Sequence, residues 1–377
     1  MKHAPLRRMS ELFRIEKGRI GIKAAVPGKY PLVTTAEKMQ SHEDVHFNGD
    51  AVCIPMISAS GHGDASIKRL HHIQGEFAVG SILCACIAKD EKQVSARYAY
   101  HYLTACKDSI LVPLMQGSAN VSLKLADIEN VEIPLPSIAE QQAIVTRLDA
   151  LIGKTRQVAA HLDSVEADAD RLLISLATRS DLSDRERVTQ GWSKASLGDA
   201  LSPTSDPVSV LGDGSYPNVG ILSFARGLFS KPPIEGTQTS AHTLYRVRAG
   251  QFIYSRLFAF EGAYAIVGQE HDGAFVSNEF PTFDIDSERA SPEFFYAYFR
   301  SPRVWEAIAH GSKGLGDRRQ RVQPAQVMNH ELWLPPRREL HRLNASFPYV
   351  MALKAKHAAI RVSNAALVPA ALQRIFG

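Results

Sequence analysis

The feature that most constrains the fold is a long helix predicted over about residues 137–180, whose apolar residues recur every three or four positions. Residues 133–136, Ile-Pro-Leu-Pro, precede it and cannot be helical, because a proline disfavours the helical conformation of the residue before it. Ser137 and Glu140 then fit an S-x-x-E capping box, in which each side chain satisfies a free N–H of the first turn. The sequence therefore predicts a helix that begins at this box and runs for roughly 60 Å.

The apolar positions of this helix follow a regular pattern over about five heptads, with one polar member, Thr155. A long amphipathic helix lying on a globular core is the simpler alternative, but so regular a stripe more often contacts another helix. We therefore predict a coiled-coil contact. The positions are Ile144, Leu148, Leu151, Thr155, Val158, Leu162, Val165, Ala169, Leu172 and Leu176.

Composition describes an ordinary chain of 377 residues, long enough for two domains that each bury a core. The net charge of +4 is too mild to indicate a polybasic tail. Cys84 and Cys86 lie in the apolar run 81–88, which predicts a buried strand, and C-x-C without a second pair is a poor zinc signature. With neither a signal-peptide core nor a run of 18 apolar residues, we expect a cytoplasmic protein without metal or cofactor.

The two halves of the chain repeat each other. Five segments of the first half recur in the second, in the same order and at nearly one offset, which predicts an internal duplication. In each half, short strands lead to an aromatic-rich helix, a Gly-Ser loop, one more strand, a proline and a long helix. The paired segments are 28–33 with 214–219, 48–54 with 249–254, 97–103 with 293–299, 117–118 with 311–312, and 133–136 with 332–335.

The second half should end in its own long helix, from about Pro336 to Phe376. Its apolar stripe is less regular, and Pro348 and Pro369 should kink or split it. If a two-fold relates the halves, the two long helices run antiparallel and pair. The polar residues 180–194 form the linker between the halves.

Catalytic signatures are missing from the sequence. It contains no P-loop, no G-x-S-x-G and no H-E-x-x-H motif. The glycine-rich segments 61–64 and 311–316 lack the spacing of a dinucleotide loop, and Asn278-Glu-Phe-Pro281 lacks the second proline of an amino-methyltransferase motif. His71 and His72 have no further metal ligand nearby in the sequence. A chain of this length without a catalytic cluster predicts recognition rather than reaction.

Basic loops in both halves are the remaining functional signal. Arg and Lys neutralise phosphates, and Arg also contacts base edges in the major groove, so these loops are candidate DNA contacts. Composition alone leaves the alternative of ordinary solvated loops equally open. The candidates are Lys68, Arg69, His71, Ser118, Asn120 and Lys124 in the first half, and Arg226, Arg256, Lys313, Arg318, Arg319 and Arg321 in the second.

These residues carry a family resemblance. The segment IPLPSIAEQQAIVTRLDAL at 133–151 closely resembles a conserved region of type I restriction–modification specificity subunits. Asp181-Leu-Ser-Asp184, with Gly191-Trp192 and Leu197-Gly-Asp199, is similar to the junction into their second half, and residues 372–377 are similar to their C-terminal end. Two features differ: the second motif, 334–340, keeps Glu339 but lacks the Gln pair, and the start lacks the usual Trp-bearing segment.

The resemblance implies an α+β fold, with two similar mixed α/β target-recognition domains joined by two long antiparallel coiled-coil helices about a pseudo-two-fold axis. The predicted divisions are a first recognition domain at 1–133, a spacer helix at 134–182, a second recognition domain at 183–334 and a second long helix at 335–377. Each domain would recognise one half of a split, asymmetric DNA target, and the helices would set the spacing.

The resemblance also implies a subunit that is not an enzyme. Two adenine-methylating modification subunits would dock on it, usually joined by two motor–nuclease subunits, in a phage-defence system. A targeting subunit of a type IIB-like restriction system and a coiled-coil scaffold that binds only protein are the alternatives. The DNA-binding readings predict an affinity that falls steeply with salt, whereas the scaffold predicts no DNA affinity.

Overall fold

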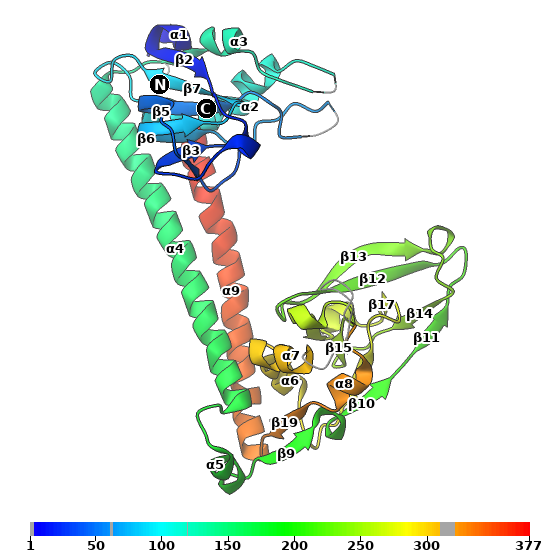
Figure 1. Ribbon diagram of the computed structural model, residues 1–377. Helices are drawn as coiled ribbons and strands as arrows, with labels where there is room; N and C mark the ends of the chain where they lie inside the picture. Colours follow the sequence, from blue (N-terminus) through cyan, green and yellow to red (C-terminus); the bar gives the residue numbers. More distant parts are fainter. Residues whose placement is uncertain (1–3, 61–62, 119, 310–320) are drawn as a thin grey trace. The chain divides into compact units, whose positions relative to one another are not determined.

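The computed structural model describes residues 4–60, 63–118, 120–309 and 321–377. The chain divides into two compact units (Figure 1). Unit 1 comprises residues 1–161 together with 359–377, and unit 2 comprises residues 162–358. Each long helix contributes one part to each unit.

Unit 1 is built on a six-stranded sheet with the strand order β2-β7-β5-β6-β3-β4. Helix α2 packs on one face of this sheet, and a short antiparallel pair, β1 with β8, holds the two ends of the domain together. The elements are β1 Leu6–Arg8, α1 Met9–Leu12, β2 Phe13–Lys17, β3 Tyr30–Val33, β4 Gln40–His42, β5 Phe47–Pro55, β6 His71–Val79, β7 Leu83–Ala88, α2 Ala96–Ile110, α3 Leu125–Glu129 and β8 Glu132–Pro134, with short 3-10 turns at 22–24 and 112–114.

The central strands of this sheet are buried on both faces. Along β5, Val52 and Ile54 join the core under α2, while Ala51 and Cys53 join a second core on the opposite face. This alternation follows from the two-residue period of a strand. The predicted buried strand around Cys84 is confirmed, because β7 carries Cys84 and Cys86 fully buried.

Unit 2 repeats this plan. The order β10-β18-β15-β16 reproduces β2-β7-β5-β6, and the antiparallel pair β9 with β19 reproduces β1 with β8. Its remaining strands form a second sheet, β11-β14-β17-β12-β13, whereas in unit 1 the extra strands extend the same sheet. The strands are β9 Ser193–Ser196, β10 Leu201–Thr204, β11 Pro207–Ser209, β12 Ser215–Leu222, β13 Gly227–Glu235, β14 Thr243–Arg246, β15 Phe252–Tyr254, β16 Tyr264–Ile266, β17 Phe275–Val276, β18 Thr282–Ile285 and β19 Glu331–Leu334.

The sequence repeats fall on equivalent elements of the two units. Segments 48–54 and 249–254 overlap β5 and β15, 97–103 and 293–299 overlap α2 and α6, and 133–136 and 332–335 overlap β8 and β19. The predicted duplication is therefore confirmed, although residues 311–312 lie outside the described residues. The helices of unit 2 are α5 Asp184–Thr189, α6 Pro292–Tyr298, α7 Pro302–Ala309 and α8 Pro324–Met328, with 3-10 turns η3 Leu197–Asp199, η4 Gly236–Gln238, η5 Ala259–Glu261 and η6 Gln269–His271.

The first long helix, α4, spans Ile138–Thr178 and begins as the sequence predicts. Glu140 Oε2 accepts bonds from the Ser137 N–H at 2.9 Å and hydroxyl at 2.6 Å, and Ser137 Oγ accepts the Glu140 N–H at 3.4 Å. Between α4 and the second unit's sheets, the predicted polar linker contains α5, which has a capping box of its own at Ser183 and Glu186.

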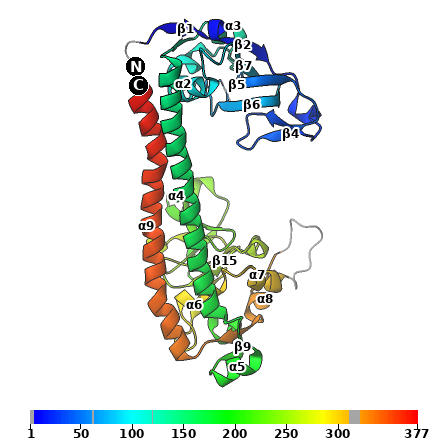
Figure 2. The same ribbon diagram turned by 90° about the vertical axis from the view of Figure 1, so that its left-hand side faces the viewer.

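The second long helix, α9, is a single helix over Arg337–Phe376, so the predicted split at Pro348 or Pro369 is wrong. A proline inside a helix removes one backbone bond, at a cost of roughly 3 kcal/mol. Packing against α4 on both sides of the prolines offsets that cost. In each unit the two helices run antiparallel (Figure 2): Thr155 contacts Asn364 in unit 1, and Asp170 contacts Lys354 in unit 2.

The predicted apolar stripe of α4 needs a correction at two positions. Leu148 and Leu162 are buried, but Val158 is 39% exposed and Leu172 is 51% exposed. In unit 2 the buried positions are Leu162, Ala169, Leu173 and Ala177. Their spacing exceeds 3.5 residues per turn, because a helix that is not strongly supercoiled keeps about 3.6 residues per turn and drifts away from a strict heptad.

Candidate nucleic-acid interface

The loops that carry the predicted first-half contacts lie next to each other in unit 1. Ser58 donates its N–H to Val121 O at 2.9 Å, and Leu123 donates its N–H to Met56 O at 2.8 Å. These bonds join the loop after β5 to the loop before α3. We call the described residues 56–60, 63–70, 116–118 and 120–124 the first loop cluster. It brings together six of the predicted contacts: Lys68, Arg69, Ser118, Asn120 and Lys124 within it, and His71 at its edge.

A second loop cluster occupies the equivalent place in unit 2. Val322 donates its N–H to Arg256 O at 2.9 Å, which joins the loop after β15 to the segment before α8. This bond is the counterpart of the bond between Leu123 and Met56, since β15 repeats β5 and α8 repeats α3. We call this surface the second loop cluster; it comprises residues 223–227, 255–262, Glu279 and 321–323. It contains Arg226, Arg256 and Arg321; Lys313, Arg318 and Arg319 lie outside the described residues.

The polar side chains of the first loop cluster differ in their exposure and in the hydrogen bonds and ion pairs that they form. Lys68, Ser118, Asn120 and Lys124 are exposed, and Lys124 Nζ donates to Gln116 Oε1 at 3.3 Å. Arg69 is half-buried and forms an ion pair with the exposed Glu37 at 3.2 Å. Burial, and then the charge of Arg69, lower the pKa of His71. A neutral His71 suits a hydrogen bond better than a phosphate contact.

The cations of the second cluster are held in defined positions. Arg256 Nη2 donates to Gln323 Oε1 at 2.7 Å, and Arg321 forms an ion pair with Glu279 at 3.1 Å. Arg226 is exposed, and its Nε donates to Ser223 O at 3.0 Å. An anion at this surface would meet arginines whose side chains are already oriented, which lowers the entropic cost of binding.

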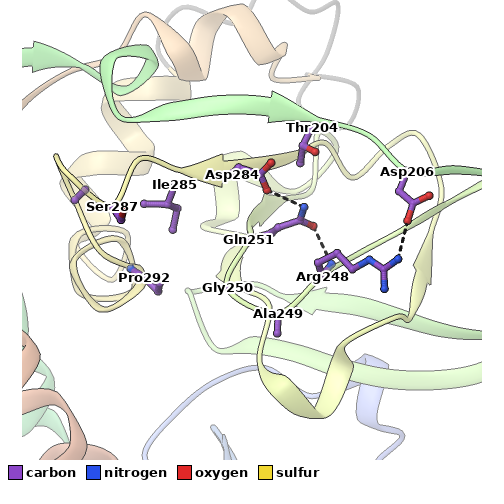
Figure 3. Close-up of a pocket in the computed structure, with 11 residues that line it drawn as sticks. Thr204, Asp206, Arg248, Ala249, Gly250, Gln251, Asp284, Ile285, Ser287 and Pro292 are labelled. Carbon is purple, nitrogen blue, oxygen red and sulfur yellow. Dashed lines mark hydrogen bonds and ion pairs between the residues drawn. The ribbon is translucent and has the colours of Figure 1, made fainter.

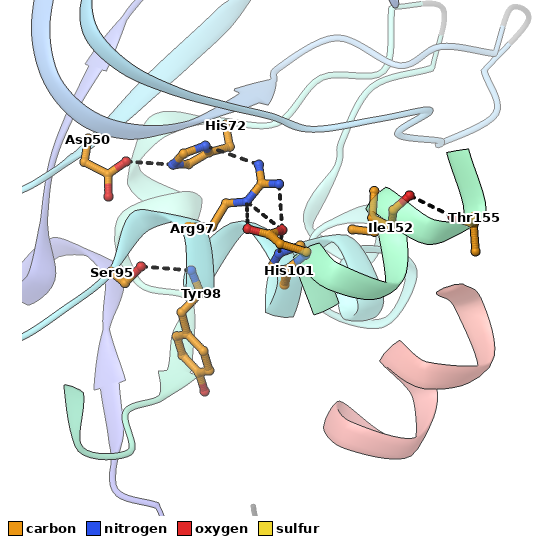
Figure 4. Close-up of polar contacts among 9 residues, drawn as sticks. Asp50, His72, Ser95, Arg97, Tyr98, His101, Ile152 and Thr155 are labelled. Atoms are coloured by element: carbon orange, nitrogen blue, oxygen red, sulfur yellow. Dashed lines mark hydrogen bonds and ion pairs between the residues drawn. The ribbon is translucent and has the colours of Figure 1, made fainter. Parts of the chain in front are cut away.

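A polar network joins helix α2 and strands β5 and β6 of unit 1 to α4 (Figure 4). Arg97 of α2 binds Asp149 of α4 through Nη2 at 2.7 Å and Nε at 3.1 Å, and the buried His101 donates Nε2–H to the same carboxylate at 3.0 Å. Arg97 also donates to His72 Nδ1 at 3.3 Å, and His72 Nε2–H donates to Asp50 at 2.7 Å.

The pKa values at this junction follow from the packing. Burial raises the pKa of Asp149, but the bonds and charge of Arg97, and then of His101, outweigh burial and leave it below its ordinary value. Burial, followed by the charge of Arg97, lowers the pKa of His101 despite its bond to Asp149. Sequence reasoning missed this network, because Arg97 and Asp149 are far apart in the chain and nothing in either segment shows that they meet.

The Gln pair of the 133–151 motif has a structural role. Gln141 is fully buried, where its Oε1 accepts the Ser95 N–H at 2.9 Å and its Nε2 donates to Gln93 O at 3.1 Å and Pro136 O at 2.9 Å. It thus joins the start of α4 to the start of α2. In the second repeat the buried polar residue is Glu339, which accepts from the exposed Arg338 and Arg342 at 3.1 and 3.2 Å.

An open polar pocket of about 540 Å³ lies in unit 2 beside β10 and β18 (Figure 3). Arg248 pairs with Asp206 at 3.1 Å, and the uncharged amide of Gln251 donates through Nε2 to Asp284 at 3.0 Å. The charge of Arg248 is thus balanced within the pocket, whereas the bond to Asp284 comes from a neutral group. No group of three His, Cys, Asp or Glu suited to a metal ion occurs among the described residues.

Two exposed aromatic residues of the second loop cluster also escaped the sequence prediction. Phe224 is 62% exposed and Phe258 is 49% exposed. The signal for Phe224 was present in the segment Ser223-Phe-Ala-Arg-Gly227, an aromatic residue beside an arginine in a turn, but sequence alone does not show that the ring is outside the core. No described helix combines the length and apolar character of a membrane span.

Comparisons with known proteins agree with this architecture. Residues 4–167 match the family model described as "Type I restriction modification DNA specificity domain". The type I restriction enzyme EcoDI specificity subunit of Escherichia coli is 25% identical over 162 residues, which are 42% of this chain and 33% of that protein. The matched part thus spans about a third of the curated relative's length.

Two solved structures share the fold along nearly the whole chain. The type I restriction–modification S subunit from M. genitalium has a TM-score of 0.50 at 14% identity and covers 100% of this chain and 97% of its own. A chain from a structure described as addressing complex assembly and conformational transition of the type I R-M system has a TM-score of 0.57 at 15% identity, covering 99% and 97%. The predicted fold class, with two mixed α/β domains and two long antiparallel helices, is confirmed.

Proposed function

We propose, from the match of residues 4–167 to a type I restriction–modification DNA specificity domain, that the chain is the non-catalytic subunit that directs such an enzyme to one DNA sequence. The observation that best supports this proposal is the pair of equivalent loop clusters, one in each repeat. Both follow the central strand of their sheet and both carry oriented or exposed cations. Phosphate contacts from such cations position a protein on the duplex.

Each loop cluster recognises one half of a bipartite target. The two clusters differ in sequence: Lys68, Ser118 and Asn120 on one side have no counterparts of the same type among Arg226, Arg256 and Arg321 on the other. Because base contacts depend on side-chain identity, the two half-sites differ and the target is asymmetric.

The long helices set the distance between the half-sites and dock two methyltransferase subunits. Apolar side chains that a single chain leaves exposed on these helices support a docking role: Val158 and Leu172 on α4, and Tyr349 and Val362 on α9. Two motor–nuclease subunits join through the methyltransferases. The target of methylation is an adenine in each half-site, and the chemistry belongs to the partners.

Methylation mapping tests the proposal. The chain is co-expressed with its proposed adenine methyltransferase partner in a host that lacks adenine methylation, and modified bases are sequenced genome-wide. We expect one bipartite asymmetric motif with a fixed gap, and no methylation when the chain is omitted. A continuous motif, or the same motif without the chain, contradicts the proposal.

A salt titration separates DNA recognition from a protein-only scaffold, the competing interpretation of the exposed helix residues. The purified complex is titrated with the mapped duplex at several salt concentrations. A subunit that neutralises several phosphates loses affinity steeply as salt rises, with a slope of about −0.9 per phosphate on logarithmic axes. A DNA affinity that is micromolar or weaker and does not change with salt concentration favours the scaffold.

A further inference from the structure

The turn between β12 and β13 has an unfavourable backbone conformation, and it exposes an aromatic ring to solvent. Leu222 and Gly227 form the last pair of this hairpin, so residues 223–226 make the turn. Phe224 and Ala225 at its centre have φ values of +62° and +49°. Asn and Gly usually occupy these positions, and a bulky residue there is a genuine outlier. Such outliers persist only where the surroundings fix them, and they cluster at functional sites.

The neighbouring turn fixes this conformation. Phe224 donates its N–H to Glu261 O and Ala225 donates its N–H to Gly262 O, each at 2.8 Å, while the Ser223 hydroxyl donates to Glu261 Oε2 at 2.8 Å. Gly262 is required here, because a Cβ on it would lie 2.8 Å from the Trp305 ring. The turn is therefore tied at three consecutive residues to a segment of the second loop cluster.

Only one side of the Phe224 ring packs against the rest of the protein. One side meets the buried Trp305 edge-on, with ring centroids 5.9 Å apart, and the ring as a whole remains 62% exposed. Ala225, in contrast, is buried. The turn thus anchors itself through Ala225 and the backbone bonds, and the ring projects outward.

An arginine lies beside this ring. The Arg226 guanidinium lies 5.9 Å from the Phe224 ring centroid, and Arg256 belongs to the loop, residues 255–262, that binds the turn. A rigid aromatic beside an arginine, with a second arginine in the adjoining loop, matches the chemistry of a nucleic-acid contact, in which arginines bind phosphates and an apolar side chain enters a base step. A protein partner's apolar pocket would not need the arginines.

We propose that Phe224 inserts at a base step within the DNA half-site recognised by unit 2 and partly unstacks it. The inference rests on the proposed function and adds a specific role for one side chain. The fixed turn means that no loop has to become ordered on binding, so the ring is presented in advance. Arg226 and Arg256 then contact the phosphates flanking the opened step.

Fluorescence of 2-aminopurine tests the insertion, because this base brightens when it is unstacked. The complex of the full chain with its methyltransferase is bound to duplexes that carry the mapped motif, with the reporter at successive positions of both half-sites. The methyltransferases flip their target adenines out of the duplex, so brightening at those positions is set aside. We expect additional brightening at one other step of one half-site. Phe224→Asn should abolish it and weaken binding about 5- to 150-fold, as for loss of one stacked base, since Asn tolerates the left-handed conformation and keeps the turn.

Phe229→Ala is the matched control. Phe229 is a partly exposed phenylalanine in the same hairpin, with Lys231 5.6 Å from its ring, but its ring lies over Gly220 and its backbone is an ordinary strand. This variant should keep both the brightening and the affinity. Unchanged urea unfolding of both variants shows that the fold is retained.

The outcomes separate the two proposals. If the complex of the unsubstituted chain binds the mapped duplex tightly but brightens no position besides the target adenines, or if Phe224→Asn keeps that additional brightening, the insertion is overturned and the proposed function stands. If the unmodified complex binds the mapped duplex no better than an unrelated duplex, the proposed function fails, and the insertion fails with it.

Discussion

At the scale of single residues, the most informative side chain is Gln141, because it explains why a glutamine follows the capping box. Its amide satisfies backbone groups at the start of α2 and in the segment before α4. A buried backbone group that loses its partner costs free energy comparable to a lost hydrogen bond. The second repeat has Leu340 at the position of Gln141, and its buried polar residue, Glu339, matches Glu140 and binds Arg338 and Arg342 of its own helix.

Replacing Gln141 with Ala should destabilise unit 1 by about 1–3 kcal/mol, because three part-buried backbone groups lose their partner at up to about 1 kcal/mol each. Urea unfolding measures this loss. Gln142→Ala is the control, since Gln142 is the exposed neighbour on the same turn and should change the unfolding free energy by less than about 0.5 kcal/mol. Equal effects of the two substitutions would contradict the assigned role.

His101 should make the stability of unit 1 depend on pH. Its pKa is lowered in the folded state, so the unfolded chain takes up the proton first as pH falls. The stabilisation is complete above the unfolded pKa of about 6.5 and is lost as pH falls toward the lower folded value. His101→Gln keeps a donor for Asp149 and cannot titrate, so its unfolding free energy should fall less steeply between about pH 7 and 5.5.

The difference in slope is at most about 1.4 kcal/mol per pH unit for one proton. Urea unfolding at a series of pH values measures it. His161→Gln changes an exposed histidine of α4 and serves as the comparison. A slope that is the same in His101→Gln as in the unmodified chain would rule out His101 as a source of the pH dependence.

At the scale of elements, the long helices show how far a sequence pattern predicts structure. The start of α4 was predictable because a capping box acts through residues only three apart. The burial of its later turns was not, because it depends on where α9 lies against it. A heptad count places Leu172 in the contact, whereas the helix buries Leu173 instead.

Leu173→Ala should therefore destabilise unit 2 by about 2–5 kcal/mol, the usual cost of truncating a buried leucine. Leu172→Ala, one residue away and half exposed, should cost less than about 1 kcal/mol. Urea unfolding of the isolated chain distinguishes them. If Leu172→Ala were the more costly change, the heptad prediction would be right and the burial pattern of the structure wrong.

The same reasoning applies to the candidate site. Local sequence identified the basic loops and the strands before them, since turns and strands have short-range signals. The Arg97–Asp149 junction could not be found, because it joins elements that only the fold brings together. Phe224 could not be found either, because an aromatic residue is usually buried and its exposure depends on a left-handed turn that no residue type in Ser223–Arg226 announces.

At the scale of the whole molecule, duplication supplies the two similar domains that we propose recognise DNA. The helices that end the repeats are the proposed spacer, which sets the distance between the two half-sites. The repeated strand order and the repeated bond after the central strand argue that each unit carries its own DNA contacts. The division into domains at 133, 182 and 334 remains a prediction. The compact units cut both long helices, near residues 161 and 358.

Shortening both helices tests whether their length sets the gap between the half-sites. Deleting 156–162 from α4 and 357–363 from α9 removes matched segments, since Thr155 faces Asn364 and Glu166 faces His357. Seven residues shorten a helix by about 10 Å, or about three base pairs of DNA, and keep its rotation nearly unchanged. Methylation mapping should show loss of the original gap and a motif about three base pairs shorter. Methylation at the original gap would refute the proposal that helix length sets the gap.

The packing of Phe376 against Tyr98 and Tyr102, with ring centroids 6.0 and 5.6 Å apart, has a consequence for biosynthesis. Unit 1 includes residues 359–377, so the ribosome synthesises all of residues 162–358 before the missing part of unit 1 exists. At about 5–20 residues per second this delay is about 10–40 s. The domain translated first is thus the last to be completed, and throughout that interval the nascent chain offers chaperones a bare helix surface.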